Sequence, residues 1–105
     1  MLFRSFKNPI VTLDQLDQLR KSYPTIPSYL FENQLFKVPA GWLIESCGWK
    51  GKRIGDVGVH TNQALVIVNH HNASGKEIFN LSEQILFDVE KKFGLTLTRE
   101  VNMIN

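Results

Sequence analysis

A long amphipathic helix is predicted between residues 75 and 93. Five large apolar side chains recur there at helical spacing: Ile78, Leu81, Ile85, Val89 and Phe93. The opposite face carries Lys76, Glu83 and Lys91, and Gly94 ends the pattern. A helix with a single apolar face needs another layer to cover that face. The rest of the chain is therefore expected to supply a sheet or further helices that pack against it.

Strand patterns occur on both sides of this helix. Ala64–Val68 is a continuous apolar run, suited to a strand buried on both faces. Leu95–Ile104 alternates apolar and polar residues. Phe3–Val11 is expected to be a short strand that ends at Pro9, because proline cannot donate to a ladder. Two glycines in Ile54–His60 favour a bulged strand or a close backbone approach.

Two shorter helices complete the predicted pattern. Thr12 and Gln15 form a capping box for a helix that ends near residue 22, and Ala40–Cys47 forms the second. Residues 28–34 show no periodicity and are expected to be a loop. The order of elements predicts an α+β fold, a small mixed sheet with packed helices, as a single domain over residues 1–105.

Composition narrows the class of protein. A hydrophobic content of 43% and a charged content of 21% are typical of one globular domain. The lone Cys47 cannot form an internal disulfide, which favours a reducing compartment. The apolar runs are too short to span a bilayer, and the first residues lack the features of a signal peptide. A net charge of +2 does not by itself imply nucleic acid. We expect a soluble cytoplasmic domain without membrane or nucleic-acid partners.

Two residue types raise the question of metal or thiol chemistry. His70 and His71 are candidate ligands, but adjacent side chains point apart in an extended chain, and no cysteine or acidic residue lies at ligand spacing. A solvated turn explains the pair, so no metal site is expected. Cys47 lies on the apolar side of its helix, which favours a buried structural cysteine over a reactive one.

Two further sites remain open on the residues alone. Lys50, Lys52 and Arg53 follow the second short helix, either as a solvated loop whose cations offset the helix dipole or as a phosphate site. Glu100 is either an outward-facing polar residue of an alternating strand or a carboxyl held in a cleft for proton chemistry. The sequence contains no P-loop and no dinucleotide-binding glycine motif.

Four short stretches are informative as a set. They read S-F-K-N-P at Ser5–Pro9, A-G-W-L-I-E at Ala40–Glu45, V-H-x-x-Q-A-L-V at Val59–Val66 and L-x-x-E-V-x-x-I at Leu97–Ile104. In this order and spacing the chain resembles the UDP-N-acetylenolpyruvoylglucosamine reductases of bacterial peptidoglycan synthesis. The resemblance covers nearly the whole chain, but only the C-terminal, substrate-binding domain of the family. It implies that the FAD-binding domains of a complete enzyme lie outside this sequence.

The resemblance implies an oxidoreductase reaction. NADPH reduces bound FAD, and the flavin passes a hydride to the enolpyruvyl group of UDP-N-acetylglucosamine enolpyruvate, which yields UDP-N-acetylmuramate. The resulting carbanion must be stabilised and protonated. The expected partners are this nucleotide-sugar and the FAD-binding domains, and the isolated chain is expected to be inactive and to bind neither cofactor. The alternative is a stand-alone or remnant nucleotide-sugar-binding module without enzyme activity.

The catalytic residues implied by the resemblance are Ser5 and Glu100. Glu100 matches a family glutamate that assists protonation, and Ser5 is the candidate proton donor. The chain has one phenylalanine fewer than the family pattern, so an ungapped alignment puts Arg4 at the donor position instead. In a regular strand Ser5 and Asn8 would also lie on opposite faces, because side chains alternate.

Five further residues match family positions that contact the substrate: Asn8, Tyr29, Lys37, Lys50 and Gln63. By this resemblance Tyr29 covers the uridine diphosphate. Lys37 and Lys50 supply cationic contacts to the diphosphate, and Gln63 hydrogen-bonds the nucleotide or the sugar. The resemblance implies no metal ligand.

Overall fold

A computed structural model describes the backbone of residues 2–103 and the side chains of residues 6–100. Within this range the helices are α1 (Leu13–Ser22), α2 (Ala40–Ser46) and α3 (Gly75–Phe93). The strands are β1 (Leu2–Lys7), β2 (Ile10–Thr12), β3 (Tyr29–Glu32), β4 (Leu35–Lys37), β5 (Arg53–Ile54), β6 (Val57–Val59), β7 (Val66–Asn69) and β8 (Thr98–Met103). No helix of this range is both long enough and apolar enough to cross a membrane.

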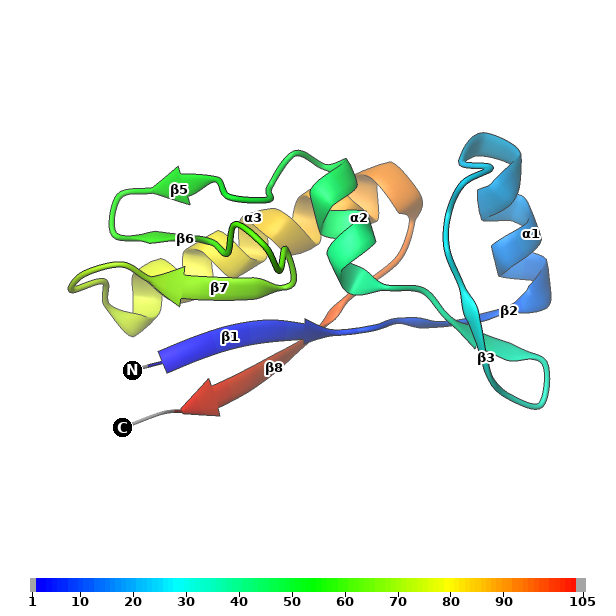
Figure 1. Cartoon of the computed structure of the whole chain (residues 1–105), viewed down its shortest axis with the longest axis horizontal. Coiled ribbons are helices and arrows are strands. Elements are labelled where there is room, and N and C mark those ends of the chain that lie inside the picture. The colour runs from blue at the N-terminus through cyan, green and yellow to red at the C-terminus, as the bar shows by residue number, and fades with distance from the viewer. Residues whose placement is uncertain (1, 104–105) are drawn as a thin grey trace.

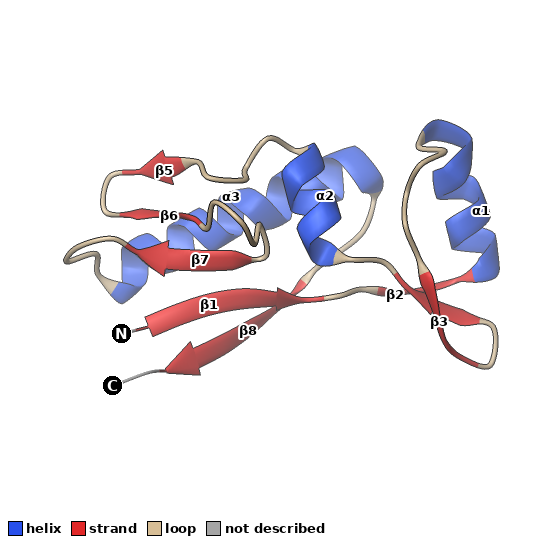
Figure 2. Cartoon of the chain, viewed as in Figure 1, coloured by secondary structure: helices blue, strands red, loops and turns tan. Residues whose placement is uncertain are grey.

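The strands form two sheets that lie side by side along the molecule (Figure 1). The larger sheet has the strand order β5-β6-β7-β1-β8, and the smaller sheet has the order β2-β4-β3. The chain passes from one sheet to the other between β1 and β2, where Pro9 lacks the N–H group that a ladder needs. Figure 2 shows α2 and α3 with the larger sheet and α1 with the smaller one.

Helix α3 supplies a large part of the core beneath the larger sheet. It has the predicted bounds, and the five predicted apolar residues are all buried: Ile78, Leu81, Ile85, Val89 and Phe93. Ser74 and Glu77 form a capping box at its start, which satisfies N–H groups that the first turn leaves without partners. Gly94 ends the helix in the left-handed conformation, with φ of 70°. The helix packs against α2, β6 and β7.

The smaller sheet is covered by α1. The predicted capping box is confirmed: the Gln15 N–H donates to the Thr12 hydroxyl at 3.2 Å, and the Thr12 N–H donates to the Gln15 side chain at 2.8 Å. Val11 of β2 and Leu16 of α1 are buried and join the same core as α3. The two sheets and three helices therefore share one hydrophobic core.

The expected α+β class is confirmed, but the sheet differs from the mixed sheet that was expected. Every pairing among the described strands is antiparallel. The first strand, expected to end at Pro9, ends at Lys7, and a second strand, β2, begins at Ile10 directly after the proline. The last strand begins at Thr98, three residues later than expected, after a connection in which Leu95 and Leu97 are buried.

The loop predicted for residues 28–34 is wrong. These residues contain β3 and the two-residue turn of a hairpin that pairs β3 with β4. Asn33 and Gln34 both have positive φ, of 39° and 65°, as the favoured two-residue hairpin turn requires. All four residues of β3 are exposed, so no alternation of apolar and polar residues marks the strand in the sequence.

The bulged strand predicted for Ile54–His60 is instead the hairpin of β5 and β6. Ile54 pairs with Val57, and Gly55 takes φ of 61° in the turn between them. The close backbone approach was predicted correctly for Gly58. A β-carbon at that position would lie 3.0 Å from the Lys52 carbonyl oxygen and 3.2 Å from the Arg53 Cα atom. Only glycine fits there without a shift of the neighbouring strand.

Candidate functional site

One cavity that holds several of the candidate residues lies at the junction of the two sheets. It has a volume of about 520 Å³. Its lining comes from both sheets and from the connection that precedes β7: Phe6, Lys7, Asn8, Ile10, Lys37, Leu65 and Glu100. Three of the seven residues expected at the site, Asn8, Lys37 and Glu100, are therefore brought together although they are far apart in sequence.

Asn8 ties the cavity to two other elements. Its side-chain oxygen accepts a hydrogen bond from the backbone N–H of Ala40 at 2.8 Å, at the start of α2. Its side-chain nitrogen donates to the Tyr29 hydroxyl at 3.0 Å. Tyr29 does not line the cavity, but this bond places its hydroxyl directly beside a residue that does. Ala40 is fully buried, so the Asn8 oxygen satisfies an N–H group that lies away from solvent.

Lys37 brings a positive charge to the same cavity. It pairs with Tyr29 across β3 and β4, and the side chain is partly buried. Its ammonium nitrogen lies 4.5 Å from the centre of the Phe31 ring, a cation–π geometry that holds a cation without neutralising it. No carboxylate of the described residues lies within ion-pair distance of Lys37. The ammonium group therefore suits an anionic ligand.

Glu100 lines the cavity from β8 and is exposed. The ladder between β1 and β8 pairs residue 5 with Glu100, residue 4 with Val101 and Phe6 with Arg99, without a register shift. Directly paired positions of an antiparallel ladder lie on the same face of the sheet. Position 5 therefore shares the face of Glu100, whereas position 4 belongs to the other face.

The two faces of this ladder differ in their surroundings. Phe6 is buried, and its partner Arg99 packs toward α3, where the Arg99 Nε donates to the Ser82 hydroxyl at 2.8 Å. The face that carries Phe6 and Arg99 is thus the core face. Because β1 ends at Lys7, the strand alternation does not extend to Asn8. The predicted opposition of Ser5 and Asn8 applies only to a regular strand that would include both.

Lys50 and Gln63 lie outside the lining of this cavity. Lys50 forms an ion pair of 3.5 Å with Glu45 of α2. Gln63 lies in the connection from β6 to β7, and its backbone N–H donates to the His60 ring at 3.2 Å. The two connections are neighbours, because a β-carbon built on Gly51 would lie 3.6 Å from the Thr61 methyl group.

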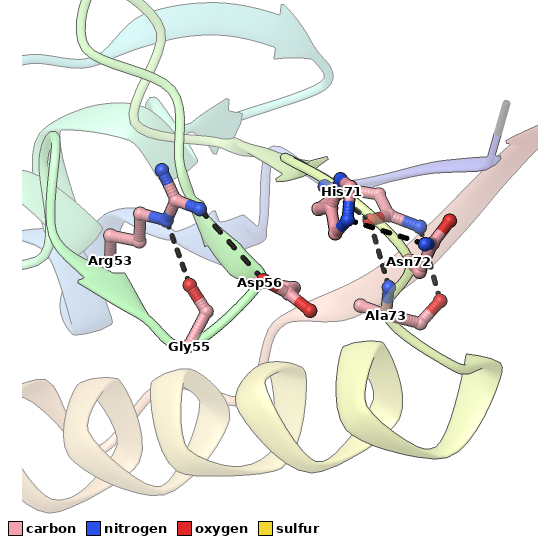
Figure 3. Close-up of polar contacts among 7 residues, drawn as sticks. Arg53, Gly55, Asp56, His71, Asn72 and Ala73 are labelled. Atoms are coloured by element: carbon pink, nitrogen blue, oxygen red, sulfur yellow. Dashed lines mark hydrogen bonds and ion pairs between the residues drawn. The ribbon is translucent and has the colours of Figure 1, made fainter.

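The other basic residues that follow α2 have partners within the chain. The Lys52 ammonium lies 4.5 Å from the centre of the Trp49 ring. The Arg53 Nε donates to the Gly55 carbonyl oxygen at 2.7 Å, and the guanidinium lies 3.9 Å from the Asp56 carboxylate (Figure 3). Lys50, Lys52 and Arg53 are all exposed. This arrangement fits the interpretation of a solvated loop better than that of a phosphate site.

The histidine pair lies in the turn after β7. The His71 backbone N–H donates to the Asn69 side chain at 3.1 Å, and the His71 ring lies 3.3 Å from the Asn72 amide (Figure 3). Across the part of the chain that the structure describes, no group of three histidine, cysteine or acidic residues is placed to hold a metal ion.

Cys47 is partly buried at the end of α2. Burial raises the pKa of its thiol above the ordinary value; the charge of Lys92 opposes this effect and that of Asp88 adds to it. A raised pKa keeps the thiol protonated near neutral pH, and the thiol is then a weak nucleophile. This environment fits the structural role that the sequence favoured.

Sequence reasoning missed Lys7, Ile10 and Leu65 as residues that line the cavity. Lys7 is adjacent to Asn8, and its place in the S-F-K-N-P stretch is the signal that could have drawn attention to it. Leu65 follows Gln63 by two residues in another of the quoted stretches. For Ile10 the sequence holds no signal, because it depends on the turn of the chain after Pro9.

Comparison with known proteins identifies the family. The family model described as UDP-N-acetylenolpyruvoylglucosamine reductase, C-terminal domain, matches residues 4–104. Proteins named UDP-N-acetylenolpyruvoylglucosamine reductase from Flavobacterium johnsoniae and from Porphyromonas gingivalis are each 50% identical over 99 residues. One of the same name from Alcanivorax borkumensis is 46% identical over 95 residues.

The matched region is a minor part of these relatives. It covers 94% of this chain but 29% of the Flavobacterium and Porphyromonas proteins, and 90% of this chain but 27% of the Alcanivorax protein. The family resemblance of the four sequence stretches is thus confirmed by a match that spans nearly the whole chain. The chain belongs to the family of UDP-N-acetylenolpyruvoylglucosamine reductase C-terminal domains.

Proposed function

We propose that residues 1–105 form the substrate-binding domain of an FAD-dependent, NADPH-using reductase of the cytoplasm. Its substrate would be UDP-N-acetylglucosamine enolpyruvate and its product UDP-N-acetylmuramate, a step of peptidoglycan synthesis. The main support for this proposal is that one cavity is lined by Asn8, Lys37 and Glu100. The family resemblance assigned a role to each of these three residues.

The chemistry of the cavity suits a nucleotide-sugar with a diphosphate and a carboxylate. Lys37 offers an ammonium group without a carboxylate partner among the described residues, and Lys7 adds a second ammonium group to the lining. Charge-assisted hydrogen bonds from such groups are the strong contacts to phosphate oxygens. Tyr29 lies beside them through its bond to Asn8 and offers an aromatic ring, 47% exposed, to the uridine end of the ligand.

The proton chemistry is proposed for Ser5 and Glu100. Reduction of the enolpyruvyl group leaves negative charge next to a carboxylate, and a proton must be delivered to that carbon. The register sets position 5 directly across from Glu100 and on the same face. This pairing supports Ser5, rather than Arg4, as the group that holds the proton, with Glu100 as its assisting carboxylate.

The helix starts among the described residues are partly occupied, which disfavours a bound flavin dinucleotide. The diphosphate of such a cofactor commonly binds free N–H groups at a helix start. Here α1 and α3 begin with capping boxes, and the Ala40 N–H of α2 is taken by Asn8. We therefore assign FAD and NADPH to parts of the full-length reductase outside this chain, and we expect the isolated chain to be inactive.

The binding part of the proposal is tested by titration of the isotope-labelled chain with UDP-N-acetylglucosamine, followed by NMR. We expect amide shifts at Asn8, Tyr29 and Lys37, with a Kd well above 1 μM because about half of the binding pocket would come from the missing domains. Lys37→Met removes the charge but keeps an apolar stem next to Phe31, and it should weaken binding about tenfold. Lys76→Met removes one exposed charge from α3 and serves as the matched control.

Three results would contradict this proposal. Shifts confined to residues far from the cavity would place the ligand elsewhere. Equal affinities for Lys37→Met and Lys76→Met would leave no role for the Lys37 charge. Yellow protein with flavin absorbance after purification would show that the chain itself binds the cofactor.

A further inference from the structure

The ring of His60 organises the connection between β6 and β7. Its Nδ1 atom accepts a hydrogen bond from the backbone N–H of Asn62 at 3.0 Å and a second from the N–H of Gln63 at 3.2 Å. A histidine ring nitrogen accepts only when it carries no proton, so this geometry requires the proton on Nε2. The ring thus replaces the side-chain oxygen that commonly stabilises such turns.

The same connection is closed at its base by backbone bonds. The His60 N–H donates to the Val66 carbonyl oxygen at 2.9 Å, and the Val66 N–H donates to the Gln63 carbonyl oxygen at 3.0 Å. Residues 61–65 therefore form a closed turn, with the His60 ring bonded to its first half. Without the ring, the N–H groups of Asn62 and Gln63 have no other partner among the described residues.

This turn forms one wall of the candidate site. Leu65, its last residue, lines the cavity together with Asn8, Lys37 and Glu100. Leu65 also lies against α2: a β-carbon built on Gly41 would be 3.7 Å from the Leu65 Cδ2 atom. Figure 1 shows the connection from β6 to β7 beside α2. The conformation of the turn therefore determines the positions of Leu65 and Gln63 relative to a ligand in the cavity.

We propose that His60 is a positioning residue of the nucleotide-sugar site. It acts through the turn of residues 61–65, whose shape its Nδ1 atom maintains, and it does not contact the ligand itself. This inference rests on the proposed function, because it takes the cavity to be the nucleotide-sugar site. It adds a residue and a specific atom to the site beyond the contacts that the family resemblance implied.

Two substitutions of similar size separate the role of this atom from the role of the ring as a packing group. In His60→Asn the side-chain oxygen is bonded to Cγ, as Nδ1 is in histidine, so the acceptor stays in place. In His60→Gln the amide is one carbon farther out, and its oxygen falls nearer the position of Nε2. Both replacements are uncharged and polar, which makes each the control of the other.

The experiment compares the wild-type chain with the two variants by NMR. Amide hydrogen exchange of Asn62 and Gln63 reports the two hydrogen bonds, and titration with UDP-N-acetylglucosamine reports the site. In His60→Gln we expect exchange of these two amides to be about tenfold faster and the Kd to rise about threefold to tenfold. His60→Asn should restore both quantities to within about twofold of the wild type.

Each outcome is decisive. If both variants bind like the wild type, His60 does not position the site, although the proposed function stands. If both lose affinity equally, the loss comes from the ring volume and the inference about Nδ1 is wrong. If the wild-type chain itself does not respond to UDP-N-acetylglucosamine, the proposed function fails and this inference fails with it.

Discussion

Replacement of Asn8 with alanine separates the structural role of this residue from its place in the binding cavity. Asn8 accepts a hydrogen bond from the Ala40 N–H at 2.8 Å and donates one to the Tyr29 hydroxyl at 3.0 Å. Ala40 is fully buried, whereas Tyr29 is 47% exposed. The first bond should therefore matter more for stability than the second, because a buried N–H without a partner loses its hydration as well.

The expected magnitudes follow from these environments. A buried N–H left without a partner costs about 1 to 3 kcal/mol, so Asn8→Ala should lower the free energy of unfolding by about 2 kcal/mol. Tyr29→Phe removes only the exposed bond and should cost less than about 1 kcal/mol. Asn8→Asp keeps an acceptor for the Ala40 N–H, and a negative charge at a helix start is favourable, so its stability should be close to wild type.

Urea unfolding followed by tryptophan fluorescence measures these differences, with the buried Trp49 as the reporter. For a domain of this size the slope is about 1 to 2 kcal/mol per M, so the midpoint of Asn8→Ala should fall by roughly 1 to 2 M. A midpoint for Asn8→Ala equal to that of Tyr29→Phe would refute the reasoning. Such a result would mean that the bond to Ala40 adds nothing beyond what water supplies.

Two other predictions concern the helix ends and the pH dependence of stability. Gly94→Ala should lower the free energy of unfolding by about 1 kcal/mol, because φ of 70° strains any residue with a β-carbon. Gly75→Ala has open space around it and should not lower the free energy of unfolding. Equal thermal midpoints for the two variants would contradict this. The raised pKa of Cys47 means that the unfolded chain loses this proton first as the pH rises, so stability should fall above about pH 9. Unfolding midpoints at pH 7 and 9.5 should differ less in Cys47→Ala than in the wild type, and an unchanged difference would count against this assignment.

Helix α3 was predictable because its evidence is local. The apolar spacing, the Ser74–Glu77 box and Gly94 all lie within or next to the helix and agree with one another. The same holds for α1, where Thr12 and Gln15 signal the start. In both cases the packing of one apolar face and the local bonds at the ends favour the same conformation.

The two hairpins were not predictable in the same way. In β3 every residue is exposed, including Leu30 and Phe31, so burial leaves no pattern in the sequence. Its turn uses Asn33 and Gln34 at positive φ, which lacks the glycine that commonly marks such a turn. This segment forms a strand because it pairs with β4. Pairing depends on both strands, so neither strand's own sequence reveals it.

The candidate site was predicted in part for a related reason. Asn8, Lys37 and Glu100 were named from the family resemblance, but whether they line one cavity depends on the strand order and on the junction between the two sheets. Lys50 and Gln63 came from the same kind of evidence and lie outside the lining. Sequence stretches identify residue types at positions, whereas the cavity is a property of the strand pairing.

The two sides of the cavity differ in how firmly the fold holds them. On one side, β1 is paired along both edges, with β7 and with β8, and it carries position 5, directly across from Glu100 of β8. On the other side, β3 is an edge strand with all residues exposed, and it carries Tyr29. Regions with few buried contacts open at low free-energy cost, whereas strands paired on both edges do not. Proton transfer needs groups held in fixed geometry, whereas an aromatic cover must move for a ligand to enter. This difference between β1 and β3 therefore suits the roles proposed for Ser5 and Tyr29.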